Sequence, residues 1–156
     1  MGKGPFVNGQ EIPELGNYME CTFRDEDEGI TYHSTEQYFQ SKKCKDRLEF
    51  EKMMTLSPIE CARFGRRVIK LVDNWESIKV KVMERGNLLK FEQNSQLRDI
   101  LTSTYPHRLY FCENKKQDQW DVFNETILTE LRRSFFLQTI DFKKYNVPAI
   151  TKDDES

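Results

Sequence analysis

The chain has 156 residues, of which 32% are charged and 12% aromatic, and its formal net charge is −2. This length suits one ordinary domain that buries roughly two-thirds of the surface of its unfolded chain. The near-neutral charge gives no global field that would attract nucleic acid, which argues against non-specific coating of DNA but leaves local phosphate contacts open.

Cysteine usage and hydropathy bound the class of protein further. The four cysteines show no CxxC spacing and the chain has only two histidines, so we expect no structural zinc site, no other metal and no cofactor. No signal-peptide pattern and no apolar run near twenty residues is present. We therefore expect no membrane partner, free thiols and a reducing intracellular compartment, namely the cytoplasm, with the nucleus as an alternative in a eukaryote.

The first half of the chain mixes turn-forming residues with two helix starts. Ser34 has Gln37 three residues later, which is capping-box spacing, and Gly29 follows an acidic run that favours a turn. We expect, in order, a flexible lead-in over 1–14, strands over 18–23 and 29–33, and helices over 34–44 and 48–54.

The second half is dominated by helical patterns. Ser57 followed by Pro58 predicts a helix start, and Trp75, Ile78 and Val82 form an apolar stripe at helical spacing. We expect helices from 57 to about 65, over 74–93, 95–101 and 123–136, a strand over 108–112, a loop over 113–119 and a disordered tail over 151–156. Together these elements predict an α+β fold, a mainly helical single domain over 15–150 around a small β-sheet.

Two stretches place charged side chains at unusual positions on their predicted helices, one beside other polar groups on a single face and one beside apolar residues. Glu36, Gln40 and Lys43 fall within roughly 60° of one another around a helix. Lys79 shares a side with Trp75 and therefore points toward apolar surface. On spacing alone the simpler interpretations are a solvated face for the first group, a snorkelling side chain for Lys79 and a core anchor for Trp75.

Several motifs in order resemble the NADAR family, the YbiA-like N-glycosidases and ADP-ribose-associated proteins. The similarity spans about residues 16 to 136 and is carried by five segments: 29–43 with Glu36, Gln40 and Lys43; Ala62–Arg66; Trp75–Met83 with Lys79; Lys90–Asn94; and Trp120 with the helix that ends at Arg132–Arg133. The chain lacks the glycines that follow the family's late tryptophan, so the register of Asp121 and Asn124 against the family stays open.

The resemblance implies a NADAR/YbiA-like fold and an enzyme that breaks an N-glycosidic bond to ribose. By position it implies two sets of site residues. The catalytic residues would be Glu36, Lys79, Lys43 and Asp121. The substrate-binding residues would be Asn17, Gln40, Arg66, Trp75, Asn94, Trp120 and Asn124.

These residue types suit the chemistry that the resemblance implies. A carboxylate stabilises positive charge at the sugar C1 or activates water, and a lysine with a lowered pKa either protonates the departing nitrogen or forms a Schiff base with the opened sugar. Glu36 fits the first role, and Lys43 and Lys79 both fit the second. Arg66 with Arg67 could clamp a phosphate, Trp120 could cover a base, and Asn94 is most simply a helix cap.

The expected function is hydrolysis of the ribose-to-nitrogen bond of an ADP-ribosylated guanine, in a nucleotide or in DNA or RNA, which would reverse ADP-ribosylation. Two alternatives stay open. One is an N-glycosidase of phosphoribosylated intermediates of the riboflavin pathway, and the other is a module that binds ADP-ribose or NAD without turnover. The expected partner in each case is an ADP-ribose-containing or phosphoribosyl small molecule.

Overall fold

The computed structural model describes residues 2–112 and 115–149. Within these residues the fold has six α-helices and two short antiparallel hairpins, which confirms the expected helix-rich α+β fold. The expected small sheet is two separate hairpins, β1–β2 and β3–β4, with Phe6 opposite Glu11 in the first and Phe23 opposite Tyr32 in the second. In the described part of the chain, none of the helices is both long and apolar enough to cross a membrane.

The elements follow one another closely along the chain. The hairpin strands are β1 Phe6–Val7, β2 Gln10–Glu11, β3 Phe23–Asp25 and β4 Ile30–Tyr32. The helices are η1 Pro13–Leu15, α1 Thr35–Ser41, α2 Arg47–Met53, α3 Pro58–Gly65, α4 Trp75–Gln93, α5 Ser95–Ser103, α6 Gln119–Leu137 and η2 Phe142–Tyr145.

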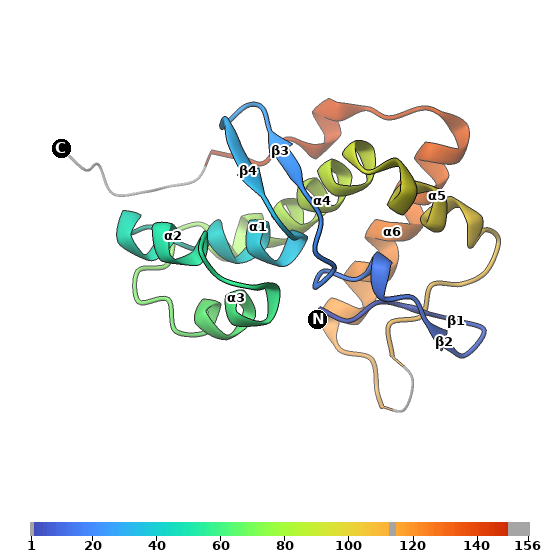
Figure 1. Cartoon of the computed structure of the whole chain (residues 1–156), viewed down its shortest axis with the longest axis horizontal. Helices are drawn as coiled ribbons and strands as arrows, with labels where there is room; N and C mark the ends of the chain where they lie inside the picture. The colour runs from blue at the N-terminus through green and yellow to red at the C-terminus, as the bar shows by residue number, and fades with distance from the viewer. Residues whose placement is uncertain (1, 113–114, 150–156) are drawn as a thin grey trace.

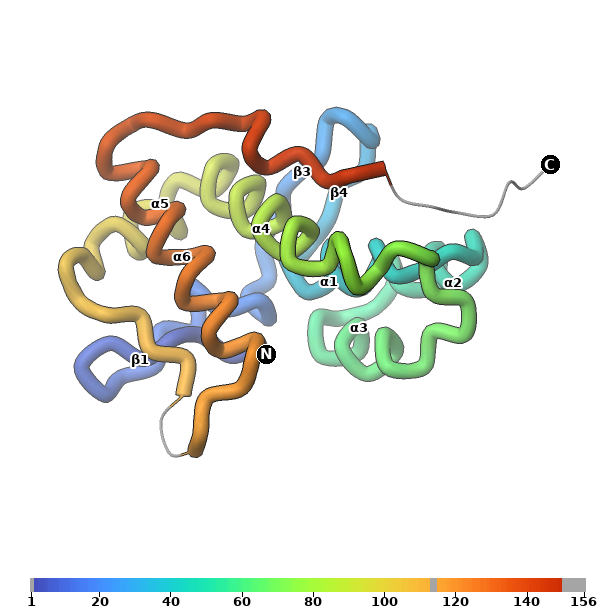
Figure 2. Tube along the Cα trace, turned by 180° about the vertical axis from the view of Figure 1, so that it is seen from behind, coloured from blue at the N-terminus to red at the C-terminus, as the bar shows by residue number. Residues whose placement is uncertain are grey.

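The long helix α4 runs through the middle of the molecule. Figures 1 and 2 show α1, α2 and α3 on one side of it and α5, α6 and the β1–β2 hairpin on the other. Its apolar stripe faces the core, since Trp75, Ile78 and Val82 are all buried. Gly86 lets α1 approach closely, because a Cβ there would lie 2.8 Å from Cδ1 of Tyr38.

The predicted starts of α1 and α3 are confirmed, and their capping explains them. The Ser34 hydroxyl accepts a hydrogen bond from the backbone N–H of Gln37 at the start of α1, and Ser57 does the same for Glu60 in a complete capping box at α3. The Gln37 side chain instead accepts from the backbone N–H of His33, one residue earlier than the box requires. Helix α1 also ends at Ser41, earlier than predicted. Helix α6 begins at Gln119, four residues before the predicted start at 123, and Asn74 at the start of α4 makes no side-chain cap hydrogen bond.

Three expectations differ from the structure. Residues 2–14, expected as a flexible lead-in, contain β1, β2 and part of η1, and Gly4 is buried so close to Ile12 that it has no room for a Cβ. The expected strand over 18–23 is displaced to β3. Over 108–112 the described residues form a single bridge, from Tyr110 to Phe6, in place of the expected strand. The predicted tail over 151–156 lies outside the described residues.

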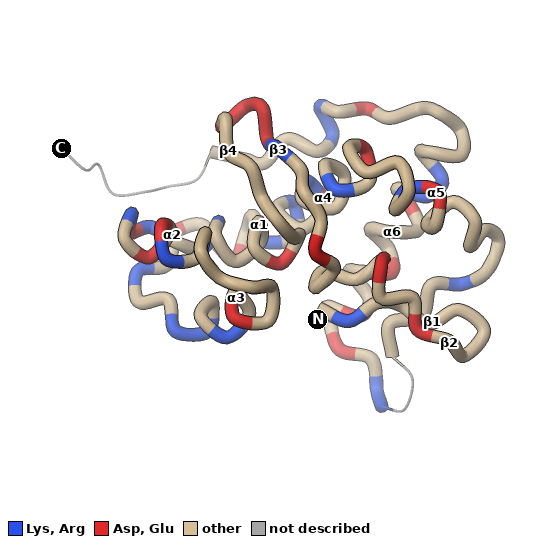
Figure 3. The backbone as a smooth tube through the Cα atoms, in the orientation of Figure 1, with Lys and Arg blue, Asp and Glu red and all other residues tan. Residues whose placement is uncertain are grey.

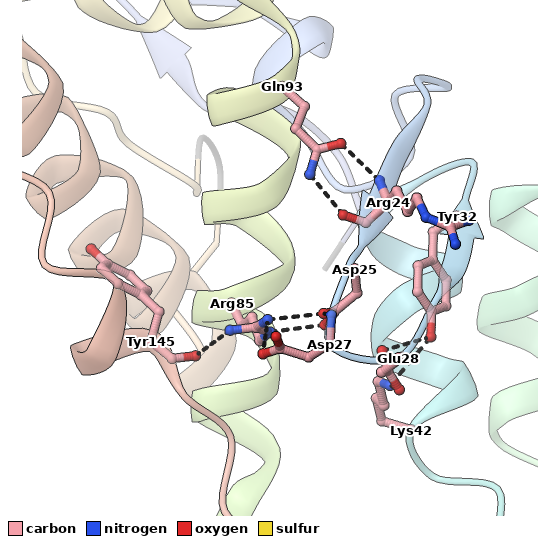
Figure 4. Close-up of polar contacts among 9 residues, drawn as sticks. All are labelled: Arg24, Asp25, Asp27, Glu28, Tyr32, Lys42, Arg85, Gln93 and Tyr145. Atoms are coloured by element: carbon pink, nitrogen blue, oxygen red, sulfur yellow. Dashed lines mark hydrogen bonds and ion pairs between the residues drawn. The ribbon is translucent and has the colours of Figure 1, made fainter.

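A buried ion network fixes the β3–β4 hairpin to α4 (Figure 4). Arg85 of α4 donates two hydrogen bonds of 2.9 Å to the Asp25 carboxylate and one of 3.0 Å to Asp27. The same guanidinium reaches the carbonyl of Tyr145 at 3.5 Å, so the segment after α6 is tied to α4 as well. Arg85 therefore joins three parts of the chain that are distant in sequence.

A second ion pair lies beside this network. Lys42 is buried, pairs with Glu28 of the hairpin turn and lies 3.2 Å from the Tyr32 hydroxyl (Figure 4). Its ammonium also lies 4.9 Å from the centroid of the Tyr38 ring. Lys42 lies roughly 120° around α1 from Glu36. This lysine and carboxylate therefore hold the hairpin on one side of α1 and leave the Glu36 side separate.

Candidate active site

One face of α1 carries the acidic side chain that the sequence singles out. Glu36, Phe39, Gln40 and Lys43 follow one another at i, i+3, i+4 and i+7, so they share that face. Glu36 is 0% exposed and Gln40 is 3% exposed. The interpretation of this stretch as a solvated face is therefore wrong, because both polar groups lie in the interior.

Glu36 and Gln40 form a buried pair. The Gln40 amide Nε2 donates to Oε1 of Glu36 at 2.8 Å. Among the described residues neither the other carboxylate oxygen, Oε2 of Glu36, nor Oε1 of Gln40 has a hydrogen-bond partner. Natural proteins leave few buried polar atoms unpaired, and such atoms are frequent where a ligand binds.

Burial also changes the proton affinity of the two ionisable groups of this face. Burial raises the pKa of the Glu36 carboxyl above its usual value, while the hydrogen bond from Gln40 and the positive charges of Lys43 and Arg66 oppose that rise. Burial lowers the pKa of the Lys43 ammonium, and the charge of Glu36 opposes that fall. The two shifts bring a proton acceptor and a proton donor closer together in strength, as acid–base catalysis requires.

An aromatic wall stands beside Lys43. Phe39 contacts Trp75 and Trp120 edge to face, with ring centroids 5.0 Å and 5.1 Å away. The Lys43 ammonium lies 5.7 Å from the centroids of both the Phe39 and Trp75 rings. Positive charge next to aromatic faces is stabilised by the ring quadrupoles, so the wall both holds Lys43 and limits its hydration.

The start of α4 is held against the end of α1. The backbone N–H of Val72 donates to the carbonyl of Lys43 at 3.0 Å, and Cys44 pairs with Leu71. This short connection places Trp75, the first residue of α4, beside Lys43. Local pairing of 43–45 with 70–72 therefore brings together two sequence motifs that are thirty residues apart.

The start of α6 brings the second tryptophan. Asp118 and Asp121 form a complete capping box, so the helix begins at Gln119 and its first turn carries Trp120. Asp121 is buried and its carboxylate accepts from the backbone N–H of Asp118 at 2.9 Å. The structure thus accounts for Asp121 by capping and for Trp120 by its contact with Phe39.

A cleft lies at the start of α3 and a basic segment lies at its end (Figure 3). The cleft has a volume of about 720 Å³ and runs between the N-terminal segment and the start of α3, with Tyr18, Gly4 and Pro58 among its walls. Burial and the charge of Glu36 raise the pKa of Tyr18, while Arg66 and Arg63 lower it, so Tyr18 is near both the cleft and this face of α1. Figure 3 shows basic residues along the end of α3 and the turn after it.

The remaining candidates have other surroundings. Asn17 is buried and its carbonyl accepts from the backbone N–H of Glu36 at 3.1 Å. The Lys79 ammonium lies 2.5 Å from Glu76 on the same helix. Asn94 donates to the carbonyls of Thr22 and Lys90, at the end of α4 roughly 28 Å from Trp75. Asn124 is buried, and within the described chain its Nδ2 has no partner.

The structure therefore gathers Glu36, Gln40, Lys43, Trp75 and Trp120, with Arg66 and Asn17 at the edge. It sets Asn94 apart and engages Lys79 in an ion pair. Phe39 and Tyr18 belong to the same region and were not predicted, although the spacing of Phe39 from Glu36 could have indicated it. No group of three or more potential metal-ligating side chains is found in the described ranges 2–112 and 115–149.

Comparisons with known proteins give three findings. The sequence model of the NADAR domain matches residues 6–143. Proteins named N-glycosidase YbiA from Escherichia coli and Shigella boydii are each 40% identical over 84 residues, which is 53% of this chain and 52% of the relative. The chain thus spans about half the length of the curated relatives it matches. The NMR structure of the Escherichia coli protein YbiA is similar with a TM-score of 0.68 and 29% identity, covering 81% of this chain and 79% of that chain.

Proposed function

Because the chain belongs to the NADAR family, we propose that it is an N-glycosidase which hydrolyses the bond between ribose and the nitrogen of a heterocyclic base. The observation that carries the proposal is the buried Glu36 carboxyl, with one unpaired oxygen, on the same helix face as Lys43. The N-glycosidase activity that names the Escherichia coli and Shigella relatives supports the same reaction class.

Glu36 is the group that meets the reacting sugar carbon. As the bond from C1′ to nitrogen lengthens, its electron pair leaves with the nitrogen and positive charge develops on C1′ and the ring oxygen. The Glu36 carboxylate stabilises that charge, and it then takes a proton from the water whose oxygen bonds to C1′. Burial strengthens this electrostatic effect, since few water molecules compete for the carboxylate.

Lys43 is the amine that serves the leaving group. Its ammonium gives a proton to the departing nitrogen, and its lowered pKa makes it a better acid than an exposed lysine. Lys43 also suits the alternative route, in which the neutral amine attacks C1′ and forms a Schiff base with the opened sugar. Lys79 instead forms an ion pair with Glu76 on α4.

The substrate we propose is an ADP-ribosylated guanine, as a nucleotide or at an exposed position of DNA or RNA. The partly exposed ring of Trp120 suits a planar base, with the buried Trp75 behind Phe39 as part of its support. Arg66, exposed beyond α3, suits a phosphate. The four free cysteines support the intracellular setting in which such a substrate occurs.

A substrate panel with mass spectrometry tests the proposal. The purified chain is incubated with ADP-ribosylated guanosine and with a phosphoribosylated riboflavin intermediate, with and without borohydride. Release of guanosine with its base unmodified is the expected result. Release of ribose phosphate from the riboflavin intermediate alone would show that this intermediate, and not ADP-ribosylated guanosine, is the substrate. Binding of ADP-ribose in calorimetry without release of any base would show that the protein is a binding module and not an enzyme.

The borohydride arm identifies the acting amine. A Schiff base is reduced to a stable secondary amine, so an adduct at Lys43 would establish the covalent route, and its absence with full turnover would leave the proton-donor route. An adduct at Lys79 would contradict the assignment of Lys43. Lys43→Met and Lys79→Met serve as a matched pair, because both replace a partly buried lysine with an uncharged side chain of similar length.

A further inference from the structure

Glu36 depends on one neighbour for its orientation. Gln40 donates from Nε2 to Oε1 of Glu36 at 2.8 Å, and this is the hydrogen bond that the described residues give to the carboxylate. Reversing the amide would set two oxygens against each other, so the orientation of the Gln40 amide is fixed by this contact. The bond leaves Oε2 of Glu36 buried and without a hydrogen-bond partner among the described residues.

Gln40 is itself braced by α3. Gly65 is the last residue of α3, it is buried, and it lies against the Gln40 amide. A Cβ at position 65 would come closer to Oε1 and Cδ of Gln40 than the 3.0 Å that real Cβ atoms keep. Since Gln40 is only 3% exposed, its amide has little space to move elsewhere.

The geometry points to Gly65 and Gln40 as positioning residues that hold the Glu36 carboxylate in its reactive orientation. Neither residue needs to touch the substrate. The backbone of Gly65 holds the Gln40 amide in place, and the amide in turn holds Oε1 of Glu36. This inference rests on the proposed function for its catalytic consequence, although the brace itself exists without substrate. It also gives a physical reason why α3 ends in a glycine at this point.

Several titratable groups face Glu36 besides the Gln40 amide, and the effect of the brace has to be separated from theirs. Lys43 at the end of α1, Arg66 after α3, Tyr18 of the loop before β3 and Cys61 of α3 all interact electrostatically with its carboxyl. Substitutions at Gly65 and Gln40 leave each of these groups in place. A change in the titration of Glu36 in such variants therefore reports the lost hydrogen bond rather than an altered charge.

The test uses Gly65→Ala, Gln40→Met and the double variant. A methyl group at position 65 displaces the Gln40 amide, and Gln40→Met removes it. Because the carboxylate loses its hydrogen bond in both variants, both raise the titration midpoint of Glu36. Carbon-detected NMR of the Glu36 carboxyl group, without substrate, measures this midpoint. Both also move the acidic limb of the rate profile to higher pH and lower kcat on the order of 100-fold. The double variant loses no more than either single variant, because both break one hydrogen bond.

Control variants separate this effect from a general weakening of α3. Glu60→Ala breaks the capping box at the other end of α3 and leaves the Glu36 titration unchanged. If Gly65→Ala folds poorly, the double variant Gly65→Ala with Gln40→Ala tests the cause. Shortening residue 40 makes room for the added methyl group and raises the melting temperature back toward the wild-type value. The inference is overturned if Gly65→Ala leaves the Glu36 midpoint at the wild-type value, or if it shifts the midpoint while Gln40→Met does not. A wild-type protein with an intact brace and no turnover would instead count against the proposed function.

Discussion

The buried Lys90 makes a pH-dependent stability prediction. Its side chain is 0% exposed and its ammonium donates to the carbonyl of Gly16 at 2.8 Å, which anchors the loop that carries Asn17 and Tyr18. Burial lowers the pKa of Lys90 from 10.5 to about 8. A difference of that size corresponds to about 3 kcal/mol, so the charged form of Lys90 lowers the free energy of unfolding by that amount.

The sign of the pH dependence follows from proton binding. Between pH 8 and 10.5 the unfolded chain keeps the Lys90 proton and the folded chain releases it, so the contribution of Lys90 to the free energy of unfolding rises with pH. Below pH 8 both states are protonated and the penalty is complete. Lys90→Met removes the penalty but also the bond to Gly16, a loss of about 1 kcal/mol.

The expected result is that Lys90→Met is more stable than the wild type by about 2 kcal/mol at pH 7, with the advantage disappearing as the pH approaches 10. Urea unfolding of both proteins at several pH values measures the difference between their free energies of unfolding. The contributions of the other titrating groups are the same in both proteins and cancel in this difference. A stability difference that stays constant from pH 7 to 10 would refute the argument. Lys81→Met, at an exposed lysine of the same helix, is the control and shows no such trend.

Three further predictions concern the network, the aromatic wall and the carboxyl. Arg85→Ala leaves Asp25 buried without its partner and lowers the free energy of unfolding by about 3 to 5 kcal/mol in urea titration. Trp120→Ala weakens the binding of ADP-ribosylated guanosine by about 1 to 3 kcal/mol in calorimetry, and Trp120→Phe restores most of it; equal affinities would contradict a stacking role. Since burial raises the pKa of Glu36, activity falls with acid at a higher pH than a carboxyl of pKa 4.5 gives, which the wild-type pH–rate profile measures.

Local signals in the sequence predict the helices well. Ser34, and Ser57 with Pro58, supply their caps within three residues, so the starts of α1 and α3 follow from nearby residues alone. The family likewise follows from ordered motifs, and the match over 6–143 confirms it. The β-structure is harder, because pairing partners such as Phe6 and Tyr110 are about a hundred residues apart.

The site is only partly predictable for a related reason. Helical spacing places Glu36, Gln40 and Lys43 on one face but does not reveal whether water or protein covers it. Spacing also aims Lys79 toward apolar surface, yet Glu76 one turn earlier pairs with it. The catalytic and binding roles of the site residues remain predictions, and their arrangement depends on packing between α1, α3 and the starts of α4 and α6.

Comparing Glu36→Gln with the wild type tests the central claim most directly. Glutamine keeps the volume of the side chain, removes the negative charge at the sugar carbon and replaces one acceptor oxygen with an NH2 group. If Glu36 stabilises the charge at C1′, release of guanosine from its ADP-ribosylated form falls by a factor of roughly 100 to 1,000 or more in Glu36→Gln, while ADP-ribose binds with unchanged affinity. Turnover at the wild-type rate in Glu36→Gln would contradict this role of Glu36.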